Sequence, residues 1–324
     1  MLVKAMCLSL IFFAASVYFQ GIWIRAMRYL RAGEAIKDYG PPGHKKKRGT
    51  PSMGGIVAFI MSPAIAAAIC YCGMSGRSEM IYIWSYPLLT GGVGLADDLL
   101  KNAGRSSEGL RSLQKLFLQT AVSVPWAWHM AGKGIALVPG SALPFGLGLP
   151  LLVLVGVGMQ NAVNVTDGLD GLAGGAVAIS LSMMFAWAHD QAVLASASAA
   201  LAVVLAFLWH NSNPAQLFMG DVGSHFWGGL LTSLCAASGA LIFIIPTAFL
   251  FGVELLTSAI QIASIRGFKK KVFKMSPLHH HFELSGMGEP SIVARFLLVH
   301  VVGIAVCVIF IEAVLKGVAW NVRT

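Results

Sequence analysis

The sequence predicts an all-α polytopic membrane protein, and three observations lead to that fold class. Of the 324 residues, 56% are hydrophobic and 11% are charged, whereas soluble domains carry about 25% charged residues. The apolar runs are long enough for helices that cross the hydrocarbon core, which takes about 20 residues each. The runs are also unbroken, whereas barrel strands are about ten residues of alternating polarity. We therefore expect about ten transmembrane helices in one integral membrane domain that comprises residues 1–324.

The expected helices are the apolar runs between polar, Gly or Pro residues. They lie near residues 3–24, 53–72, 79–96, 113–130, 148–165, 171–188, 192–209, 223–241, 243–265 and 292–315. The first run starts like a signal peptide, but it extends to Ile24 and ends at Arg25, which indicates a retained helix. Only the region of Gly239 and Pro246 separates the eighth and ninth runs, and a bend near Pro246 would suit a groove for a lipid.

Basic residues are concentrated in the connections that follow odd-numbered helices. Residues 25–48, 101–115 and 266–295 hold eight, four and six of the 23 Lys and Arg residues. The positive-inside rule makes this face cytoplasmic and places both termini in the periplasm. The net charge of +9 is thereby explained by topology, and we expect no nucleic-acid partner. The five cysteines lie in or at the ends of apolar runs without ligand spacing, which is typical of packing residues.

Five acidic residues fall at the cytoplasmic ends of the expected helices or in the loops between them. They are Asp97, Asp98, Asp167, Asp170 and Asp221. An ionised Asp in the middle of a membrane helix costs about 2.5 to 3.5 kcal/mol, so acids grouped at membrane depth need a cationic or metal partner. The acids therefore predict an active site on the cytoplasmic face.

Asp97 and Asp98 form an adjacent pair at the end of the third expected helix. Neighbouring carboxylates repel each other and are normally both ionised only in solvent or beside cations. The pair is explained either by a solvated polar turn or by a metal or general-base site. Asp221 follows Gly220 where the eighth helix begins, and it is suited either to a ligand or phosphate site or to simple N-capping. Phe218 nearby is either a packing residue or a stacking surface for a base.

The connection between the fifth and sixth helices is rich in amides and carboxylates. It runs from Asn161 through Asn164, Thr166 and Asp167 to Asp170. The two Asp residues are three apart, so a turn that enters a helix would place both carboxylates on one side. Such groups can bind a nucleobase, sugar hydroxyls or a hydrated cation. Asn164-Val-Thr166 also matches a glycosylation sequon, but its cytoplasmic position argues against modification.

Two basic stretches accompany the acids. The first leads from His44 through Lys47 into Gly-Thr-Pro-Ser-Met-Gly-Gly, which a positive flank alone does not explain. The second runs from Lys269 to Glu283 and contains three consecutive His residues, which cannot share one helical face and so suit a zinc site poorly. These side chains could instead bind a diphosphate or lipid headgroups, or move protons. Glu254 lies inside the ninth helix, where a structural and a functional acid are equally compatible with the sequence.

Taken in their order along the chain, the five stretches resemble the phospho-N-acetylmuramoyl-pentapeptide transferases within the polyprenyl-phosphate N-acetylhexosamine-1-phosphate transferase superfamily. The matching segments are 47–55, 96–98, 164–171, 218–224 and 277–283. The chain has Ser52 where that family often has Thr, a conservative difference. The resemblance implies transfer of phospho-MurNAc-pentapeptide from UDP-MurNAc-pentapeptide to undecaprenyl phosphate, which gives lipid I and UMP for peptidoglycan synthesis. It also implies Mg²⁺ and a multi-pass location in the bacterial cytoplasmic (inner) membrane.

The resemblance also assigns roles to residues. Asp221 would be the principal magnesium ligand with Asp97 and Asp98 close by, and one of that pair, with Asp97 favoured, would deprotonate the lipid phosphate. The catalytic set further includes His279 and His280, which with Lys115 and Asn211 would support the diphosphate or the sugar. The remaining substrate-binding residues are Lys47, Ser52, Asn161, Asn164, Asp167, Asp170, Phe218 and His281.

The residue chemistry agrees with this assignment, because phosphoryl transfer needs charge neutralisation and in-line positioning more than a strong base. The sequence leaves open a covalent phospho-enzyme or direct attack by the lipid phosphate, and it leaves open the oligomeric state, with which a homodimer is compatible. One alternative is a sister enzyme that moves GlcNAc-1-phosphate from UDP-GlcNAc, from which the Leu-His-His-His-Phe-Glu loop distinguishes this chain. A transporter is a second alternative, but it would place acids near helix centres, where only Glu254 lies.

Overall fold

A computed structural model describes residues 2–30, 47, 49–104 and 109–317. The helices are α1 (Leu2–Tyr29), α2 (Gly55–Tyr71), α3 (Arg77–Gly104), α4 (Ser112–Gly132), α5 (Phe145–Thr166), α6 (Leu172–Met184), α7 (Gln191–Asn211), α8 (Gly220–Ala237), a 3-10 helix η2 (Leu241–Phe243), α9 (Ile244–Thr247), α10 (Phe249–Phe268), α11 (Leu278–Glu283) and α12 (Glu289–Gly317). Strands are confined, within these ranges, to the antiparallel pair β1 (Ile135–Ala136) and β2 (Ala142–Leu143). The expectation of a helical chain is therefore confirmed.

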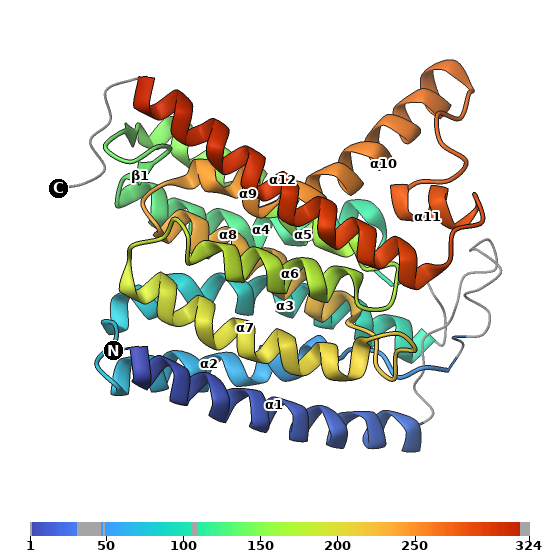
Figure 1. The fold of residues 1–324 in the computed structure, drawn as a ribbon, viewed down its shortest axis with the longest axis horizontal. Coiled ribbons are helices and arrows are strands. Elements are labelled where there is room, and N and C mark those ends of the chain that lie inside the picture. Colours follow the sequence, from blue (N-terminus) through green and yellow to red (C-terminus); the bar gives the residue numbers. More distant parts are fainter. Residues whose placement is uncertain (1, 31–46, 48, 105–108, 318–324) are drawn as a thin grey trace.

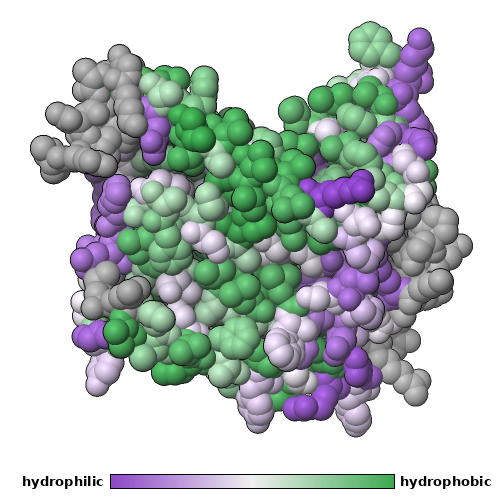
Figure 2. Space-filling view, in the orientation of Figure 1, coloured by the Kyte–Doolittle hydropathy of each residue, from purple (hydrophilic) through white to green (hydrophobic). Residues whose placement is uncertain are grey.

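Five helices are long and apolar enough to cross a membrane, namely α1, α5, α7, α10 and α12, and α2 and α6 are shorter apolar helices. Leu10 on α1, Leu154 on α5 and Val302 on α12 are among the large apolar side chains that point outward. Figure 2 shows the consequence on one face, where a broad hydrophobic area lies between more hydrophilic ends. The chain is therefore built as an integral membrane protein, while the number of ten spans stays a prediction.

Helix α8 is the centre of the bundle. It packs against α2, α3 and α5, and each of its residues from Asp221 to Ala236 is buried. A helix that is surrounded on all sides needs small residues where its neighbours come closest. A Cβ atom added to Gly55 on α2 would lie 2.0 Å from the Cα atom of Gly223 on α8. Backbone contact between these two helices therefore depends on both glycines.

The third expected helix is longer than the apolar run at 79–96, because α3 continues to Gly104. Asp97 and Asp98 consequently lie within the helix and are buried, which disagrees with the alternative of a solvated polar turn. The reason is that Lys101 and both acids form ion pairs inside the same helix, one turn apart. These pairs let the helix continue beyond its apolar part.

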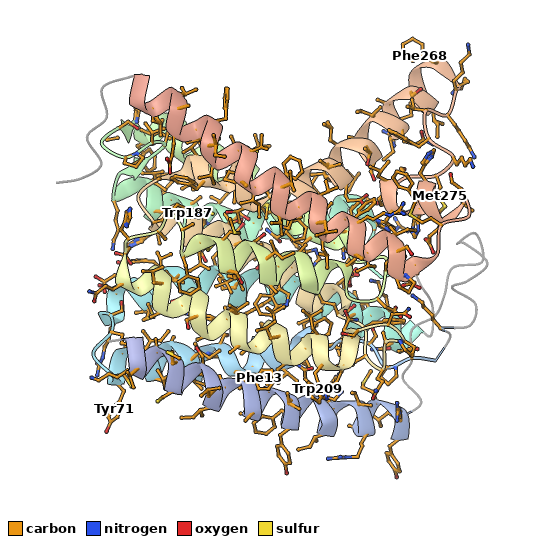
Figure 3. All side chains as sticks on the ribbon, viewed as in Figure 1. Phe13, Tyr71, Trp187, Trp209, Phe268 and Met275 are labelled. Atoms are coloured by element: carbon orange, nitrogen blue, oxygen red, sulfur yellow. The ribbon has the colours of Figure 1, made fainter. Side chains whose placement is uncertain are left out.

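The ninth expected helix, 243–265, is divided into η2, α9 and α10, and the helical path is interrupted at Ala248. Pro246, which has no N–H group to donate, lies two residues before this break. Figure 1 shows that α10 then leans away from the bundle and that α11 lies beside it, at the end of the molecule opposite β1. In Figure 3, Phe268 marks the tip of α10 and Met275 the segment that returns to α11. The lipid groove expected near this bend stays a prediction.

Candidate active site

The carboxylates of Asp97, Asp98 and Asp221 meet where α3 passes the start of α8. One oxygen from each lies within 4.8 Å of the other two, and all three residues are buried. Gly220 makes the approach possible because its positive φ of 74° turns the chain into α8, and a Cβ atom there would lie 2.8 Å from Asp98 Oδ2. A Cβ atom on Gly94 would lie 2.1 Å from the carbonyl oxygen of Asp221. Both helices therefore approach through glycine.

Two lysines lie between the carboxylates. Lys101 Nζ is 2.7 Å from Asp97 Oδ2 and 2.8 Å from Asp221 Oδ2. Lys115 Nζ is 2.5 Å from the same oxygen of Asp221 and 3.1 Å from that of Asp97. Lys115 was predicted as a site residue, but Lys101 was missed. Its spacing of four residues from Asp97 would have indicated the contact if the third helix had been extended past its apolar part.

Further hydrogen bonds fix the orientation of each carboxylate. The backbone N–H of Leu110 donates to Asp97 Oδ1 at 2.6 Å, and the N–H of the residue after Asp221 donates to Asp98 Oδ2 at 2.9 Å. Asn164 Nδ2 donates to Asp221 Oδ1 at 2.7 Å. The amide of Asn164, expected to contact the nucleotide sugar, is thus bound to the acid of α8.

The donor set suits a hard divalent cation. Mg²⁺ takes oxygen ligands at about 2.0 to 2.1 Å in an octahedron, so ligand atoms on opposite sides are about 4.2 Å apart. The oxygens of Asp97, Asp98 and Asp221 are within 4.8 Å of one another, which a small movement would convert to that spacing. Lys101 and Lys115 now balance the negative charge that a cation would otherwise neutralise. The group could therefore bind a metal ion.

A second cluster forms around Asp170, in the turn between α5 and α6. Lys47 Nζ lies 2.6 Å from Asp170 Oδ1 and 2.5 Å from Glu289 Oε1. The backbone N–H of Asp170 also donates to Glu289 Oε1, at 2.7 Å. Burial lowers the pKa of Lys47, but the hydrogen bonds to Asp170 and Glu289 outweigh it and hold the pKa above its ordinary value. Lys47 and Asp170, both predicted site residues, are therefore brought together.

Glu289 was missed by sequence reasoning. It begins α12 and is separated from Asp170 by 119 residues, and no motif connects the two positions. The loop after α7 completes the cluster, since Asn213 Nδ2 and the N–H of Ala215 donate to Asp170 Oδ2 at 3.2 and 2.9 Å. The Asp170 carboxylate is thus held by Lys47 and by the loop after α7, while Glu289 holds the backbone N–H of the same residue.

Two predicted asparagines serve contacts within the protein. Asn161 Nδ2 donates to Gln119 Oε1 at 2.9 Å. Asn211 is buried, accepts a hydrogen bond from the N–H of Gly171 at 3.0 Å and donates to the carbonyl oxygen of Leu217 at 2.8 Å. Asn211 therefore ties the turn before α6 to the loop before α8. The proposed contact of either amide with a substrate stays a prediction.

Segment 51–55 runs alongside the loop before α8. Phe218 donates its N–H to the carbonyl oxygen of Pro51 at 2.8 Å and accepts from the N–H of Gly54 at the same distance. The carbonyl oxygen of Ser52 accepts a hydrogen bond from Trp23 Nε1 at 3.1 Å. The side chains of Ser52, Phe218 and Asp167 are half-buried, and their roles in substrate binding stay predictions.

The three consecutive histidines have three different partners. His279 Nδ1 is 3.2 Å from an oxygen of Glu254, and His280 Nδ1 is 2.6 Å from an oxygen of Glu283. His281 Nδ1 accepts a hydrogen bond from the N–H of residue 274 at 3.1 Å. His279 also lies against the turn between α5 and α6, because a Cβ atom on Gly168 would be 2.2 Å from His279 Nε2. The His run is therefore adjacent to the Asp170 cluster.

Comparisons with known proteins show which sequences this chain is similar to. Residues 80–239 match the model of glycosyl transferase family 4, and residues 47–59 match signature 1 of the phospho-N-acetylmuramoyl-pentapeptide-transferases. The chain is similar to the phospho-N-acetylmuramoyl-pentapeptide-transferase of Halalkalibacterium halodurans, with 36% identity over 306 residues, 91% of this chain and 94% of that one. The enzyme of the same name from Bacillus mycoides is 37% identical over 297 residues, 88% of this chain and 90% of that one.

Those relatives match the chain over most of both lengths, and the signature covers the segment that carries Lys47, one of the residues on Asp170. The family model covers α8 and most of α3, which supply the three clustered carboxylates. On this agreement of sequence over nearly its full length, the chain belongs to the phospho-N-acetylmuramoyl-pentapeptide-transferase family.

Proposed function

We propose that this protein transfers phospho-MurNAc-pentapeptide from UDP-MurNAc-pentapeptide to undecaprenyl phosphate and releases UMP, with lipid I as the product. The observation that carries the proposal is the buried group of Asp97, Asp98 and Asp221 with two lysines beside it, in a chain of this family. A group of that kind is suited to phosphoryl transfer, in which the enzyme mainly positions the reactants and neutralises charge.

Asp221 would be the principal ligand of Mg²⁺, with Asp97 and Asp98 close by. The ion would neutralise charge on the diphosphate of the nucleotide sugar. Lys101 and Lys115 reach the same carboxylate oxygen of Asp221, so their ammonium groups are placed to bind phosphoryl oxygens once a cation takes the carboxylates. Their charge would stabilise the negative charge on the equatorial oxygens in the transition state.

Asp97 is the favoured group for removal of the proton from the lipid phosphate. Its Oδ1 is committed to the N–H of Leu110, while Oδ2 faces the two lysines. Oδ2 would accept the proton once the two lysines turn to the phosphoryl oxygens, while the bond from Leu110 keeps the carboxylate in place. His279 and His280 complete the catalytic set. The substrate-binding roles are assigned to Lys47, Ser52, Lys115, Asn161, Asn164, Asp167, Asp170, Asn211, Phe218 and His281.

We assign the protein to the bacterial cytoplasmic membrane, as one membrane-embedded domain with ten spans and both termini in the periplasm. The lipid phosphate is confined to the membrane surface, and the nucleotide sugar is a cytosolic compound. Their reaction therefore requires a site at the cytoplasmic boundary of the membrane. The concentration of basic residues in 25–48, 101–115 and 266–295 supports this orientation.

The test uses the purified full-length protein with UDP-MurNAc-pentapeptide, undecaprenyl phosphate and Mg²⁺, and it measures UMP release. We expect release that requires both substrates and stops when the metal is chelated. Replacement of the nucleotide sugar by UDP-GlcNAc should give little UMP. Absence of UMP with the first substrate, or equal turnover of the second, would contradict the proposal, and the second result would favour the GlcNAc-1-phosphate alternative.

A further inference from the structure

Glu254 is a buried acid of α10 to which the proposed mechanism gives no role. Its side chain is fully buried. The backbone N–H of Leu278 donates to Oε2 at 2.7 Å, and the N–H of His279 donates to Oε1 at 3.3 Å. Glu254 therefore joins α10 to the start of the His run.

The same carboxylate also contacts the ring of His279. Oε1 of Glu254 lies 3.2 Å from His279 Nδ1. An ionised carboxylate only accepts hydrogen bonds, so Nδ1 must carry the proton that the bond requires. In the neutral ring, Nε2 is then left with a lone pair and acts as an acceptor.

Nε2 of His279 is directed at the turn between α5 and α6. His279 is fully buried, and Nε2 has no hydrogen-bond partner within the described residues. A buried polar group without a hydrogen-bond partner is unfavourable, and a donor on a ligand would satisfy Nε2. Nε2 lies against the main chain at Gly168, since a Cβ atom there would be 2.2 Å away, so the residue at this point of the turn has no side chain that covers Nε2.

We propose that Glu254 is a positioning residue, which holds His279 in the Nδ1–H tautomer so that Nε2 accepts a hydrogen bond from the nucleotide sugar. The donor on the substrate is a hydroxyl or an amide N–H. Only the identity of that ligand rests on the proposed function. The tautomer itself depends on the contact between Glu254 and His279 and is measurable without turnover.

The tautomer is read by nitrogen NMR of the full-length protein in nanodiscs, labelled with 15N in histidine. The resonances lost in His279→Leu identify the ring of His279. In the unmodified protein we expect an unprotonated Nε2. In Glu254→Gln, the amide N–H can donate to Nδ1, so the proton should move to Nε2, whereas Glu254→Asp should keep the original tautomer. A protonated Nε2 in the unmodified protein, or no change in Glu254→Gln, would overturn the proposal.

Gln261 provides a matched control. It lies seven residues further along α10 and anchors the same loop, because its Oε1 accepts from the N–H groups of Val272 and Phe273 at 2.9 and 3.0 Å. Gln261→Leu removes an anchor of the loop without touching His279, so the tautomer should not change. A changed tautomer in this variant would show that anchoring of the loop, and not Glu254, determines the tautomer of His279. That result would refute the inference.

A double-mutant cycle gives a second readout. Glu254→Gln should lower kcat/KM for the nucleotide sugar by about 5- to 100-fold, because a substrate donor that faces a protonated Nε2 loses its hydrogen bond. The double variant Glu254→Gln/His279→Leu should have the same kcat/KM as His279→Leu alone, because the two changes remove the same interaction. Additive losses would refute the coupling. If the unmodified protein released no UMP, the proposed function would fail while the tautomer result would stand.

Discussion

At the scale of single residues, the three clustered carboxylates differ in their partners. Asp97 and Asp221 each contact both lysines, at 2.5 to 3.1 Å. Among the described lysines, Asp98 has Lys101 alone within 4 Å, at 3.9 Å, and it accepts a hydrogen bond from a backbone N–H of α8. Asp98 is thus the acid whose charge is least neutralised by lysine, and a cation at the site would complete its environment.

Replacement of Asp221 tests the metal site most directly. Asp221→Asn should lower turnover by at least about 100-fold, because a bound metal ion contributes several kcal/mol to catalysis. The response of the residual activity to Mg²⁺ concentration should also weaken. The measurement is UMP release across a magnesium titration.

The matched control for this change is Asp190→Asn. Asp190 caps α7 and accepts from the N–H of Val193 at 3.0 Å, and Asn caps helices about as well as Asp. The control should therefore keep its turnover and its magnesium response. An Asp221→Asn enzyme with the same magnesium dependence as the parent would refute the ligand role.

Replacement of Glu289 should change the affinity for the nucleotide sugar. Glu289→Gln removes the charge that holds Lys47 Nζ at 2.5 Å. We expect KM for UDP-MurNAc-pentapeptide to rise by about tenfold, as expected for loss of one charge-assisted hydrogen bond. The measurement is the KM of the purified variant against that of Glu312→Gln. Glu312 is an exposed residue of the same helix, and equal KM values in the two variants would exclude a role for Glu289 in binding.

At the scale of secondary-structure elements, the crossing of α2 and α8 determines where Asp221 lies. Gly55→Ala would make a methyl group overlap with α8, since its Cβ atom would lie 2.0 Å from Gly223 Cα, well inside van der Waals contact. Overpacking of this kind costs about 1 to 3 kcal/mol. We therefore expect a lower midpoint of thermal inactivation.

Gly92→Ala on α3 is the control for that change. A Cβ atom on Gly92 would meet nothing within 4 Å, and Ala is the better helix former, so stability should stay the same or rise slightly. If Gly55→Ala and Gly92→Ala had the same midpoint, the close crossing would not be required for the fold.

Much of the helical layout follows from the sequence, because apolar runs of membrane length have few alternative structures. The start of α8 beside Asp221 was predicted correctly from Gly220. The length of α3 was not, because its last two turns depend on ion pairs of Lys101 and not on apolar residues. The contact of Glu289 with Lys47 could not be predicted either, since it joins positions 242 residues apart and carries no local pattern.

At the scale of the whole molecule, the two ends of the bundle should face different compartments. In a variant without the native cysteines, Lys271→Cys near α11 should react with a membrane-impermeant thiol reagent only from the cytoplasmic side. Ala142→Cys in β2, at the opposite end, should react only from the periplasmic side. Both positions are exposed. Labelling of position 271 from the periplasmic side would overturn the proposed orientation.

The contact between Lys47 and Glu289 has a consequence for how the protein is made. Lys47 follows α1, and Glu289 is the first residue of α12. The two residues of this contact are therefore synthesised at widely separated times. Until α12 has been synthesised and inserted, the turn at Asp170 lacks the acceptor for its N–H group. A nascent chain that has reached residue 288 already contains Asp97, Asp98 and Asp221 but not the complete cluster around Asp170, which is the proposed nucleotide-sugar site. If that proposal holds, the order of synthesis delays substrate binding until the bundle is nearly finished.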